Sequence, residues 1–157
     1  MGGKQVLWFA VFAVLFGVVA GYQLLHYNDL DTSLAAAPPS QHVEIGGQQL
    51  DVYVADTPAK QELGLSGREG LGFNEGMLFV FEKDDEYAFW MKDMKFAIDI
   101  IWIDASGKVV HIEPNLTPDT YPHTYRPDVP ARFVLEVNAG FVERNNVQVG
   151  SMMYVGQ

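Results

Sequence analysis

An uninterrupted apolar run over residues 6–25 is the feature that most restricts how this chain can fold. Its only strongly polar residue is Gln23, so the run has no polar face of the kind that a surface helix of a soluble domain needs. A helix of this length is about 30 Å long, which matches the hydrocarbon core of a bilayer. Trp8 and Tyr22 lie near its two ends, as interfacial aromatic residues do. We therefore expect residues 1–27 to form a single-pass transmembrane anchor, with residues 6–25 in the lipid bilayer.

The charges flanking this run predict its orientation. Lys4 precedes it, whereas Asp29 and Asp31 follow it. The positive-inside rule then predicts a cytoplasmic N-terminus and an extracytoplasmic domain in the cell membrane. A cleaved signal peptide is the alternative, because residues 35–37 are alanines that a signal peptidase accepts. They lie about ten residues beyond the run, which is far for a cleavage site. If cleavage occurred, the domain would be secreted.

The rest of the chain reads as a linker and one domain. Residues 28–42 are polar and contain the pair Pro38-Pro39, which is typical of a stiff tether. Residues 43–157 are long enough for one ordinary domain. The chain is 48% hydrophobic and 13% aromatic, which argues against disorder. It has no cysteine, which excludes disulfides, thiolate metal sites and a cysteine nucleophile.

The charge of the domain restricts its partners. Nine basic and 18 acidic residues lie beyond residue 40, so this part of the chain carries a formal charge of −9. Such an acidic domain is repelled by the phosphate backbone of nucleic acids. We therefore expect no nucleic-acid partner.

Short stretches of alternating or continuous apolar residues predict strands, and glycine, proline and acidic clusters separate them. Strands at such short intervals, with little helix, predict a mainly β (α+β) domain with short helices and a compact β-barrel-like form. A parallel α/β fold would need longer helices between its strands. We expect a hairpin over 43–54, a short helix from Thr57-Pro58 to Gly64, strands at 77–81, 87–91, 97–103, 108–112, 132–137 and 152–155, turns at 82–86 and 104–107, an irregular loop over 113–129, and a short helix at 139–145.

Two carboxylates stand inside strongly apolar predicted strands. Strand alternation places Asp99 on the face of Ile101 and Ile103, and it places Glu136 on the face of Val134. A buried carboxylate must be paired or hydrogen-bonded, or its burial costs several kcal/mol. A structural interpretation pairs them with Arg68, Lys92 or Lys95, or exposes their face to solvent. A functional interpretation makes them part of a polar pocket, in which paired carboxylates could perform acid–base chemistry.

The segment 89–93 places aromatic residues and a methionine beside charges. Trp90 and Met91 next to Lys92 could form a wall with a cation beside it, which could hold a sugar ring or an anionic ligand. Alternating residues at the edge of a sheet would give the same sequence. Both interpretations stay open.

Several catalytic and metal-binding motifs are absent. The segment 64–68 fails the G-x-S-x-G nucleophile pattern because Arg68 occupies the last position. There is no Walker motif and no G-x-G-x-x-G. His111, Glu113 and His123 lack a diagnostic metal-ligand spacing. We therefore expect neither a metal nor a cofactor.

Six ordered motifs, at 64–68, 76–81, 89–93, 98–101, 104–107 and 135–140, together resemble the domain-of-unknown-function family 192. These are small proteins that are often exported or membrane-anchored. The resemblance implies a compact β-barrel-like domain and no established activity. It also implies that recurring polar positions fall on Arg68, Lys92, Asp99 and Glu136, with Trp90 and Met91 beside them. Asp93 departs from the asparagine expected after the lysine, which makes this region more acidic.

These observations favour a membrane-anchored extracytoplasmic binding or interaction module over an enzyme. Its candidate ligand-binding residues are the six just named, and its expected partners are the bilayer, a small ligand or other membrane proteins. One alternative is an accessory subunit of a larger membrane complex, since Gly17 and Gly21 form a small-xxx-small pattern. Another is an enzyme acting on cell-envelope carbohydrate through Asp99 and Glu136, which requires both carboxyl groups to face one cleft.

Overall fold

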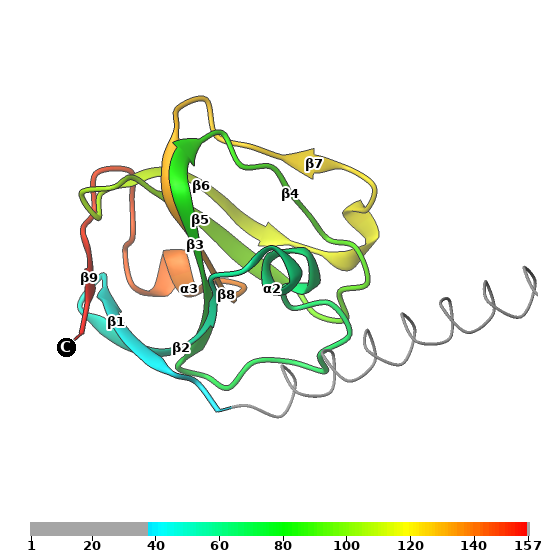
Figure 1. The fold of residues 1–157 in the computed structure, drawn as a ribbon. Coiled ribbons are helices and arrows are strands. Elements are labelled where there is room, and N and C mark those ends of the chain that lie inside the picture. Colours follow the sequence, from blue (N-terminus) through cyan, green and yellow to red (C-terminus); the bar gives the residue numbers. More distant parts are fainter. Residues whose placement is uncertain (1–37, 157) are drawn as a thin grey trace, which may run out of the picture. The chain divides into compact units, whose positions relative to one another are not determined.

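A computed structural model of the chain describes residues 38–156. The predicted anchor, its bilayer-spanning run and most of the predicted linker lie outside the described residues. Within 38–156, no helix is long and apolar enough to cross a membrane. This part of the chain forms a mainly β domain with few short helices, as the strand pattern predicts (Figure 1).

Seven strands form one sheet, and two short strands form a second. Three short helical segments connect them. The strands of the main sheet are β1 (Gln41–Ile45), β2 (Gln48–Ala55), β3 (Glu75–Asp85), β5 (Ile98–Ile103), β6 (Val109–Leu116), β8 (Ala131–Asn138) and β9 (Met153–Val155). The other elements are α2 (Pro58–Leu63), β4 (Phe89–Trp90), the 3-10 helix η1 (Pro118–Thr120), β7 (Thr124–Tyr125) and α3 (Phe141–Arg144).

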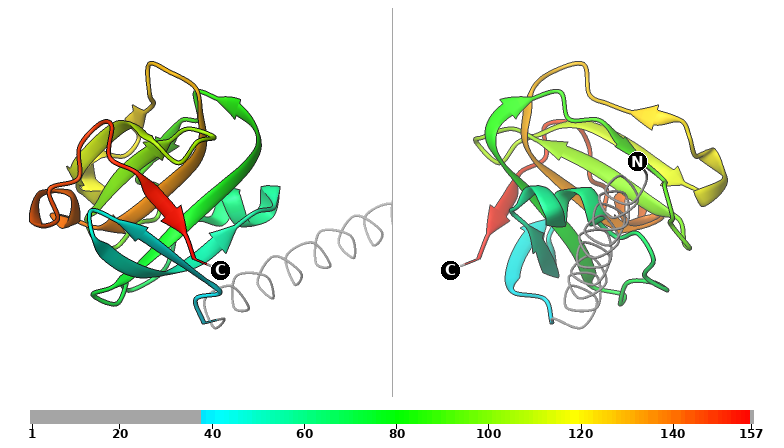
Figure 2. Two further views of the ribbon diagram at one scale, coloured as in Figure 1. Left: turned by 90° about the vertical axis from the view of Figure 1, so that its left-hand side faces the viewer. Right: turned by 45° about the vertical axis from the view of Figure 1, so that its right-hand side comes forward.

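The main sheet is a curled half-barrel, with the strand order β6-β5-β8-β3-β2-β1-β9 (Figure 2). Backbone hydrogen bonds join its two edges at one end. The Val109 amide donates to the Ser151 carbonyl at 2.8 Å, and the Met153 amide donates to the Gly107 carbonyl at 2.7 Å. The predicted barrel-like form is therefore observed as a curled sheet. Its two edge strands, β6 and β9, are joined at this end.

One pair of neighbouring strands is parallel, although all other pairs in the sheet are antiparallel. β2 pairs with β3 in parallel, with Asp51 opposite Glu75 and Ala55 opposite Phe79. A parallel pair requires a crossover of a dozen or more residues, and residues 56–74 provide one. Its helix, α2, has only six residues, so loop forms most of the crossover.

The structure corrects the predicted turn at 82–86. β3 continues through this acidic stretch to Asp85, which pairs with Ala131 of β8 after a break in register that begins at Val80. The Arg132 Nε donates to the Asp84 Oδ1 at 2.6 Å across these two strands. The acidic residues are thus held by a cross-strand ion pair that the local sequence does not reveal.

Other boundaries also differ from the prediction. β1 begins at Gln41, inside the predicted linker, and β6 extends to Leu116, inside the predicted loop. Of the strand predicted at 87–91, only residues 89–90 form β4. The hairpin, the start of α2 at Thr57 and its end at Gly64 are confirmed.

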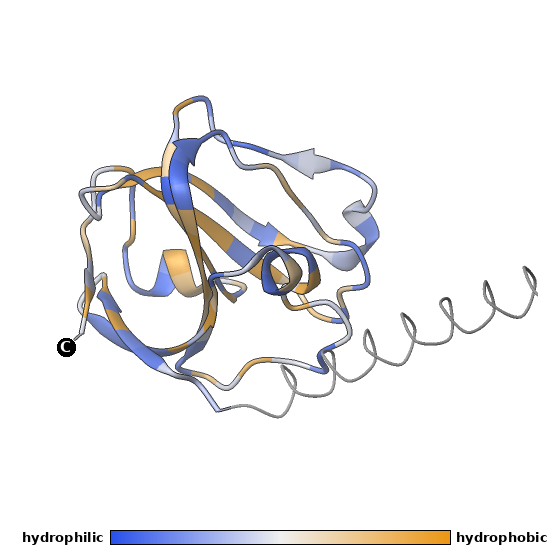
Figure 3. Cartoon of the chain, in the orientation of Figure 1, coloured by the Kyte–Doolittle hydropathy of each residue, from blue (hydrophilic) through white to orange (hydrophobic). Residues whose placement is uncertain are grey.

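Both faces of β5 are buried, which divides the core into two clusters. The strands of the main sheet carry much of the hydrophobic sequence (Figure 3). Ile101 and Ile103 belong to a cluster that draws on all seven strands of the sheet, as expected for the inside of a curled sheet. Ile98, Ile100 and Trp102 belong to a second cluster on the opposite face. The alternation predicted for this strand is therefore confirmed.

Candidate functional site

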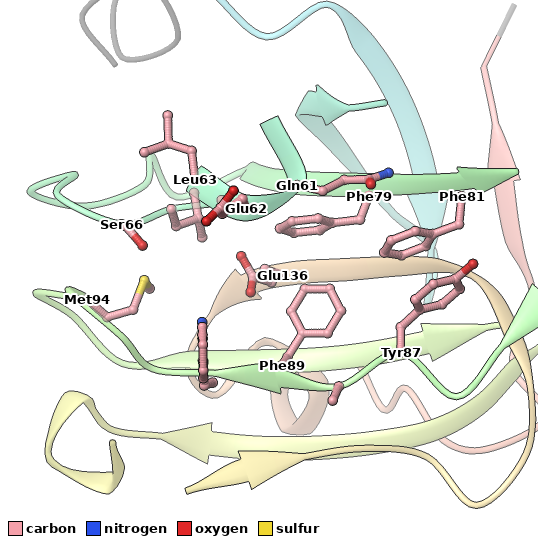
Figure 4. A pocket seen from close by; sticks show the side chains of 14 residues that line it. Gln61, Glu62, Leu63, Ser66, Phe79, Phe81, Tyr87, Phe89, Met94 and Glu136 are labelled. Atoms are coloured by element: carbon pink, nitrogen blue, oxygen red, sulfur yellow. The ribbon is translucent and has the colours of Figure 1, made fainter. Parts of the chain in front are cut away.

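A pocket of about 300 Å³ opens on the face of the second core cluster (Figure 4). It lies between α2 with its following loop and the segment 87–94, and β3 and β8 form its floor. Its walls are mostly apolar and aromatic, with a few polar groups among them. The lining residues are Gln61, Glu62, Leu63, Gly64, Leu65, Ser66, Phe79, Phe81, Tyr87, Ala88, Phe89, Trp90, Met94 and Glu136.

The helix α2 forms one wall, and its position is fixed by local capping and one side chain. The Thr57 Oγ1 accepts a hydrogen bond from the Lys60 amide, and Pro58 occupies the first turn. Gly64, with a φ of 53°, ends the helix in a conformation that favours glycine. The Gln61 Nε2 donates to the Val80 carbonyl at 2.8 Å, which holds the helix against β3.

Aromatic residues form the opposite wall. The Trp102 Nε1 donates to the Tyr87 carbonyl at 2.8 Å, which fixes the start of the segment 87–94 over the sheet. The Phe81 and Tyr87 rings stack with their centroids 3.5 Å apart. The Phe79 and Phe89 rings meet edge to face at 4.8 Å. The pocket is thus bordered by rings that are held in place by one another and by the core.

Glu136 projects from β8 into the floor of the pocket, among the other labelled side chains of Figure 4. Its strand neighbours are Met77 and Ile100, and it is only 4% exposed. Its Oε2 has no hydrogen-bond partner. Burial raises the pKa of this carboxyl from 4.5 to about 8. Near neutral pH it is therefore mostly protonated, and it can donate as well as accept.

Asp99 has a different environment. It pairs with Val137, one position away from the pairing of Ile100 with Glu136, so the two carboxylates lie on opposite faces of the sheet. Its carboxylate accepts hydrogen bonds from the amides of Asn115 at 2.7 Å, Gly140 at 3.1 Å and Val142 at 2.9 Å. Asp99 thus ties the end of β6 and the start of α3 to β5.

This geometry corrects the hypothesis of two catalytic carboxylates. An enzyme that uses Asp99 and Glu136 together needs both in one cleft, and the sheet separates them. The structural interpretation is also corrected for Asp99 and for Lys95. Asp99 is satisfied by backbone amides, and Lys95 pairs with Glu69 instead.

The remaining predicted site residues are distributed around the pocket and the core. Trp90 lines the pocket and is 52% exposed. The Lys92 Nζ lies 5.9 Å from the centroid of the Trp90 ring, beside the rim. Met91 is buried in the second core cluster. The Arg68 guanidinium lies 4.0 Å from the centroid of the Tyr53 ring and does not line the pocket. Of the six candidates, the structure brings only Trp90 and Glu136 into the pocket wall.

Among the described residues, His111, Glu113 and His123 do not gather into one metal-binding group. The His111 Nε2 lies 3.1 Å from the Glu113 Oε1, and His123 packs against the ring of Tyr125. In the described part of the chain, no three His, Asp or Glu side chains are placed to hold a metal ion.

Sequence reasoning missed most of the aromatic wall. The alternation of Met77, Phe79 and Phe81 indicates that they share one face of a strand. Placing that face beside Glu136 requires the pairing of β3 with β8, which joins residues far apart in the sequence. The fold of the segment 87–94 across this face is likewise set by the tertiary bond from Trp102.

Comparisons with known proteins agree with this fold. A family described as DUF192, "Uncharacterized ACR", matches residues 41–155. The crystal structure of a Sinorhizobium meliloti 1021 protein, described as a candidate transcription regulator, is 29% identical with a TM-score of 0.69, covering 73% of this chain and 92% of that one. A Novosphingobium aromaticivorans protein of unknown function is 27% identical with a TM-score of 0.70, covering 78% of this chain and 96% of that one. No curated protein matches the chain.

Proposed function

We propose that this chain, which belongs to the DUF192 family, is a binding module that holds a small organic ligand in the pocket between α2 and the segment 87–94. The observation that carries this proposal is the buried Glu136 carboxyl in the pocket wall, whose Oε2 has no partner. A buried polar group without a hydrogen bond costs about 1–3 kcal/mol. A ligand that hydrogen-bonds to this oxygen would remove that cost, which favours the bound state.

The size and chemistry of the pocket support the same function. A volume of about 300 Å³ is at the lower end of the range found for small-molecule sites. Such sites combine apolar and aromatic walls with a few placed polar groups. Phe79, Phe81 and Phe89 are the walls here, and Glu136 is the placed polar group.

The membrane anchor completes the proposal. The apolar run 6–25 would hold the domain at the outer face of a membrane, where it would capture its ligand. The Sinorhizobium protein is described as a candidate transcription regulator, but nucleic-acid binding is not part of the proposal for this chain. The formal charge of −9 beyond residue 40 opposes it.

Native mass spectrometry of the full chain, extracted gently from its own membrane, tests the proposal. We expect a bound mass of a few hundred daltons on the protein. Foreign chains in fixed stoichiometry and no small adduct would instead support the alternative of an accessory subunit.

A matched pair of variants locates the adduct. Ala88 lines the pocket and is exposed, so Ala88→Trp should block the pocket and abolish the adduct. Ala105 is also exposed but lies in the turn between β5 and β6, so Ala105→Trp should keep it. An adduct that survives Ala88→Trp, or that is missing from the wild-type chain, would refute binding in this pocket.

A further inference from the structure

We propose that the pocket selects an organic cation, a protonated amine carried on a small apolar or aromatic body. This inference rests on the proposed function, because it names the chemical class of the ligand that the pocket holds. Three features of the lining support it: its charge, its supply of hydrogen-bond donors and acceptors, and its aromatic rings.

The first feature is the charge of the lining. Among the described residues that line the pocket, the carboxyl groups are those of Glu62 and Glu136, and none of these lining residues is a lysine, arginine or histidine. Lys92 lies beside the rim, with its Nζ 5.9 Å from the centroid of the Trp90 ring. An anionic ligand would face two carboxyl groups with no cation in the wall to hold it. A cation would be attracted by the Glu62 carboxylate and by Glu136 once it ionises, and Lys92 lies outside the lining.

The second feature is the supply of hydrogen-bond donors and acceptors. Gln61, Ser66 and Tyr87 each donate to a backbone carbonyl, those of Val80, Lys92 and Lys83 respectively. The other side-chain donors of the lining are the indole N–H of the half-exposed Trp90 and the protonated carboxyl of Glu136, which gives up its proton if it ionises.

Acceptors remain in the lining after these bonds are made. The side-chain oxygens of Gln61 and Ser66 keep lone pairs, and the Glu136 Oε2 is unpartnered. An ammonium group has three donors and no acceptor, so it complements such a lining.

The third feature is the aromatic wall. Rings present a negative face that attracts cations, and this attraction strengthens when water is excluded. Phe79, Phe81, Tyr87 and Phe89 line the pocket together with Glu136 (Figure 4), and Trp90 also belongs to the lining. The same rings provide apolar surface for the body of the ligand. A neutral alcohol would gain only the apolar contacts and one hydrogen bond.

Protonation gives the inference a second signature. The free Glu136 carboxyl is mostly protonated near neutral pH, because burial raises its pKa to about 8. An ammonium group beside it would stabilise the carboxylate, so binding at pH 7 should release close to one proton to the buffer. The ionisable side chains that line the same pocket are Glu62 on α2 and Tyr87 on the opposite wall. The strand neighbours Met77 and Ile100 are not ionisable, and beyond Met77 lies Tyr53 with the Arg68 guanidinium over its ring.

The test is calorimetric titration of the full chain in detergent with 2-phenylethylammonium and with 2-phenylethanol, a neutral probe of similar shape. We expect the ammonium probe to bind at least about tenfold more tightly than the alcohol. Titration at pH 7 in two buffers of different ionisation enthalpy should show the release of close to one proton. Glu136→Gln should lower the affinity for the ammonium probe by about tenfold or more, and it should leave the alcohol nearly unchanged.

Failure of this inference is distinguishable from failure of the proposed function. If the wild-type chain bound 2-phenylethylammonium and 2-phenylethanol with equal affinity, selection of a cation would be overturned. This comparison needs no variant. Unchanged ammonium binding in Glu136→Gln, or no measurable binding of the ammonium probe, would also overturn it. The proposed function would still stand if the native adduct is present in the wild-type chain and is lost in Ala88→Trp.

Discussion

Glu136 and Asp99 are both buried carboxyl groups on neighbouring strands, yet they serve different purposes. Asp99 is surrounded by three backbone amides, each of which donates to its carboxylate. Glu136 receives no such stabilisation at its Oε2, and burial raises its pKa. The hydrogen bonds to Asp99 indicate a structural role for this residue. The unpartnered Oε2 of Glu136 could instead form a hydrogen bond with a ligand.

The unusual pKa of Glu136 predicts a pH-dependent stability difference. The carboxyl has a folded-state pKa of about 8, above its ordinary value of 4.5, so the unfolded chain ionises first as the pH rises. The wild-type fold then loses stability between about pH 4.5 and pH 8, at up to about 1.4 kcal/mol per pH unit, and no further above that range.

Glu136→Gln removes this loss. Urea unfolding followed by tryptophan fluorescence should show the variant gaining several kcal/mol relative to the wild type between about pH 5 and about pH 9. A difference that stays constant across this range would show that the carboxyl is not buried without a partner.

Substitution of Asp99 is expected to lower the stability of the fold, whereas Glu136→Gln raises it. Asp99→Asn weakens three charge-assisted bonds and turns an amide donor toward backbone amides. We therefore expect a loss of about 1.5–3 kcal/mol in the free energy of unfolding, with ligand binding retained. Asp128→Asn, an exposed control, should change stability by less than about 0.5 kcal/mol. Equal effects in the two variants, by urea denaturation, would refute the structural role of Asp99.

At the scale of single residues, the sequence placed Asp99 and Glu136 in strongly apolar strands, but it left open whether they are buried and could not predict what surrounds them. Strand alternation gives the face of a residue within its own strand. It does not give the register between strands, and that register places Asp99 and Glu136 on opposite faces of the sheet. It also brings the amides of Gly140 and Val142 to Asp99.

At the scale of elements, the contact between the edges of the sheet near β6 and β9 depends on Gly107. Gly107 has a φ of 87°, and a Cβ there would lie 2.7 Å from the Met153 carbonyl oxygen. Gly107→Ala should therefore strain the turn and separate β9 from the start of β6. Gly150 has a φ of 99°, but nothing lies within 4 Å of a Cβ at that position.

This pair of glycines separates backbone strain from the close contact. Gly107→Ala should cost about 1–2 kcal/mol more than Gly150→Ala, because only the former also disrupts the edge contact. Hydrogen exchange of the Met153 amide, which donates to Gly107, should accelerate in Gly107→Ala alone. Equal stability losses and equal exchange would show that the edge contact contributes nothing.

At the scale of elements, locally encoded features were predicted well and tertiary ones were not. Thr57, Pro58 and Gly64 give the start and end of α2, because capping is local. The continuation of β3 through Asp84 depends on Arg132, which lies 48 positions away in the sequence. The parallel pairing of β2 with β3 likewise has no signal in either strand alone.

For the whole molecule, the anchor is a prediction that the chain itself can test. A protein with a tag before residue 1 should keep that tag and remain in the membrane after an alkaline wash. Deletion of residues 6–25 should release it, because no other segment of that sequence is long and apolar enough. Loss of the tag and a soluble, shortened protein would support the cleaved signal peptide instead.

The central claim is that the buried Glu136 carboxyl in the pocket has an oxygen without a hydrogen-bond partner, and that a ligand supplies this partner. Titration of its side-chain carboxyl carbon by nuclear magnetic resonance, in the full chain and with Glu136→Gln to assign the signal, tests this directly. The structure predicts a pKa of about 8 in the free protein, and a marked decrease when 2-phenylethylammonium is added. A pKa near the ordinary value of 4.5 in the free protein would show that the carboxyl is already solvated or paired, and it would contradict the account.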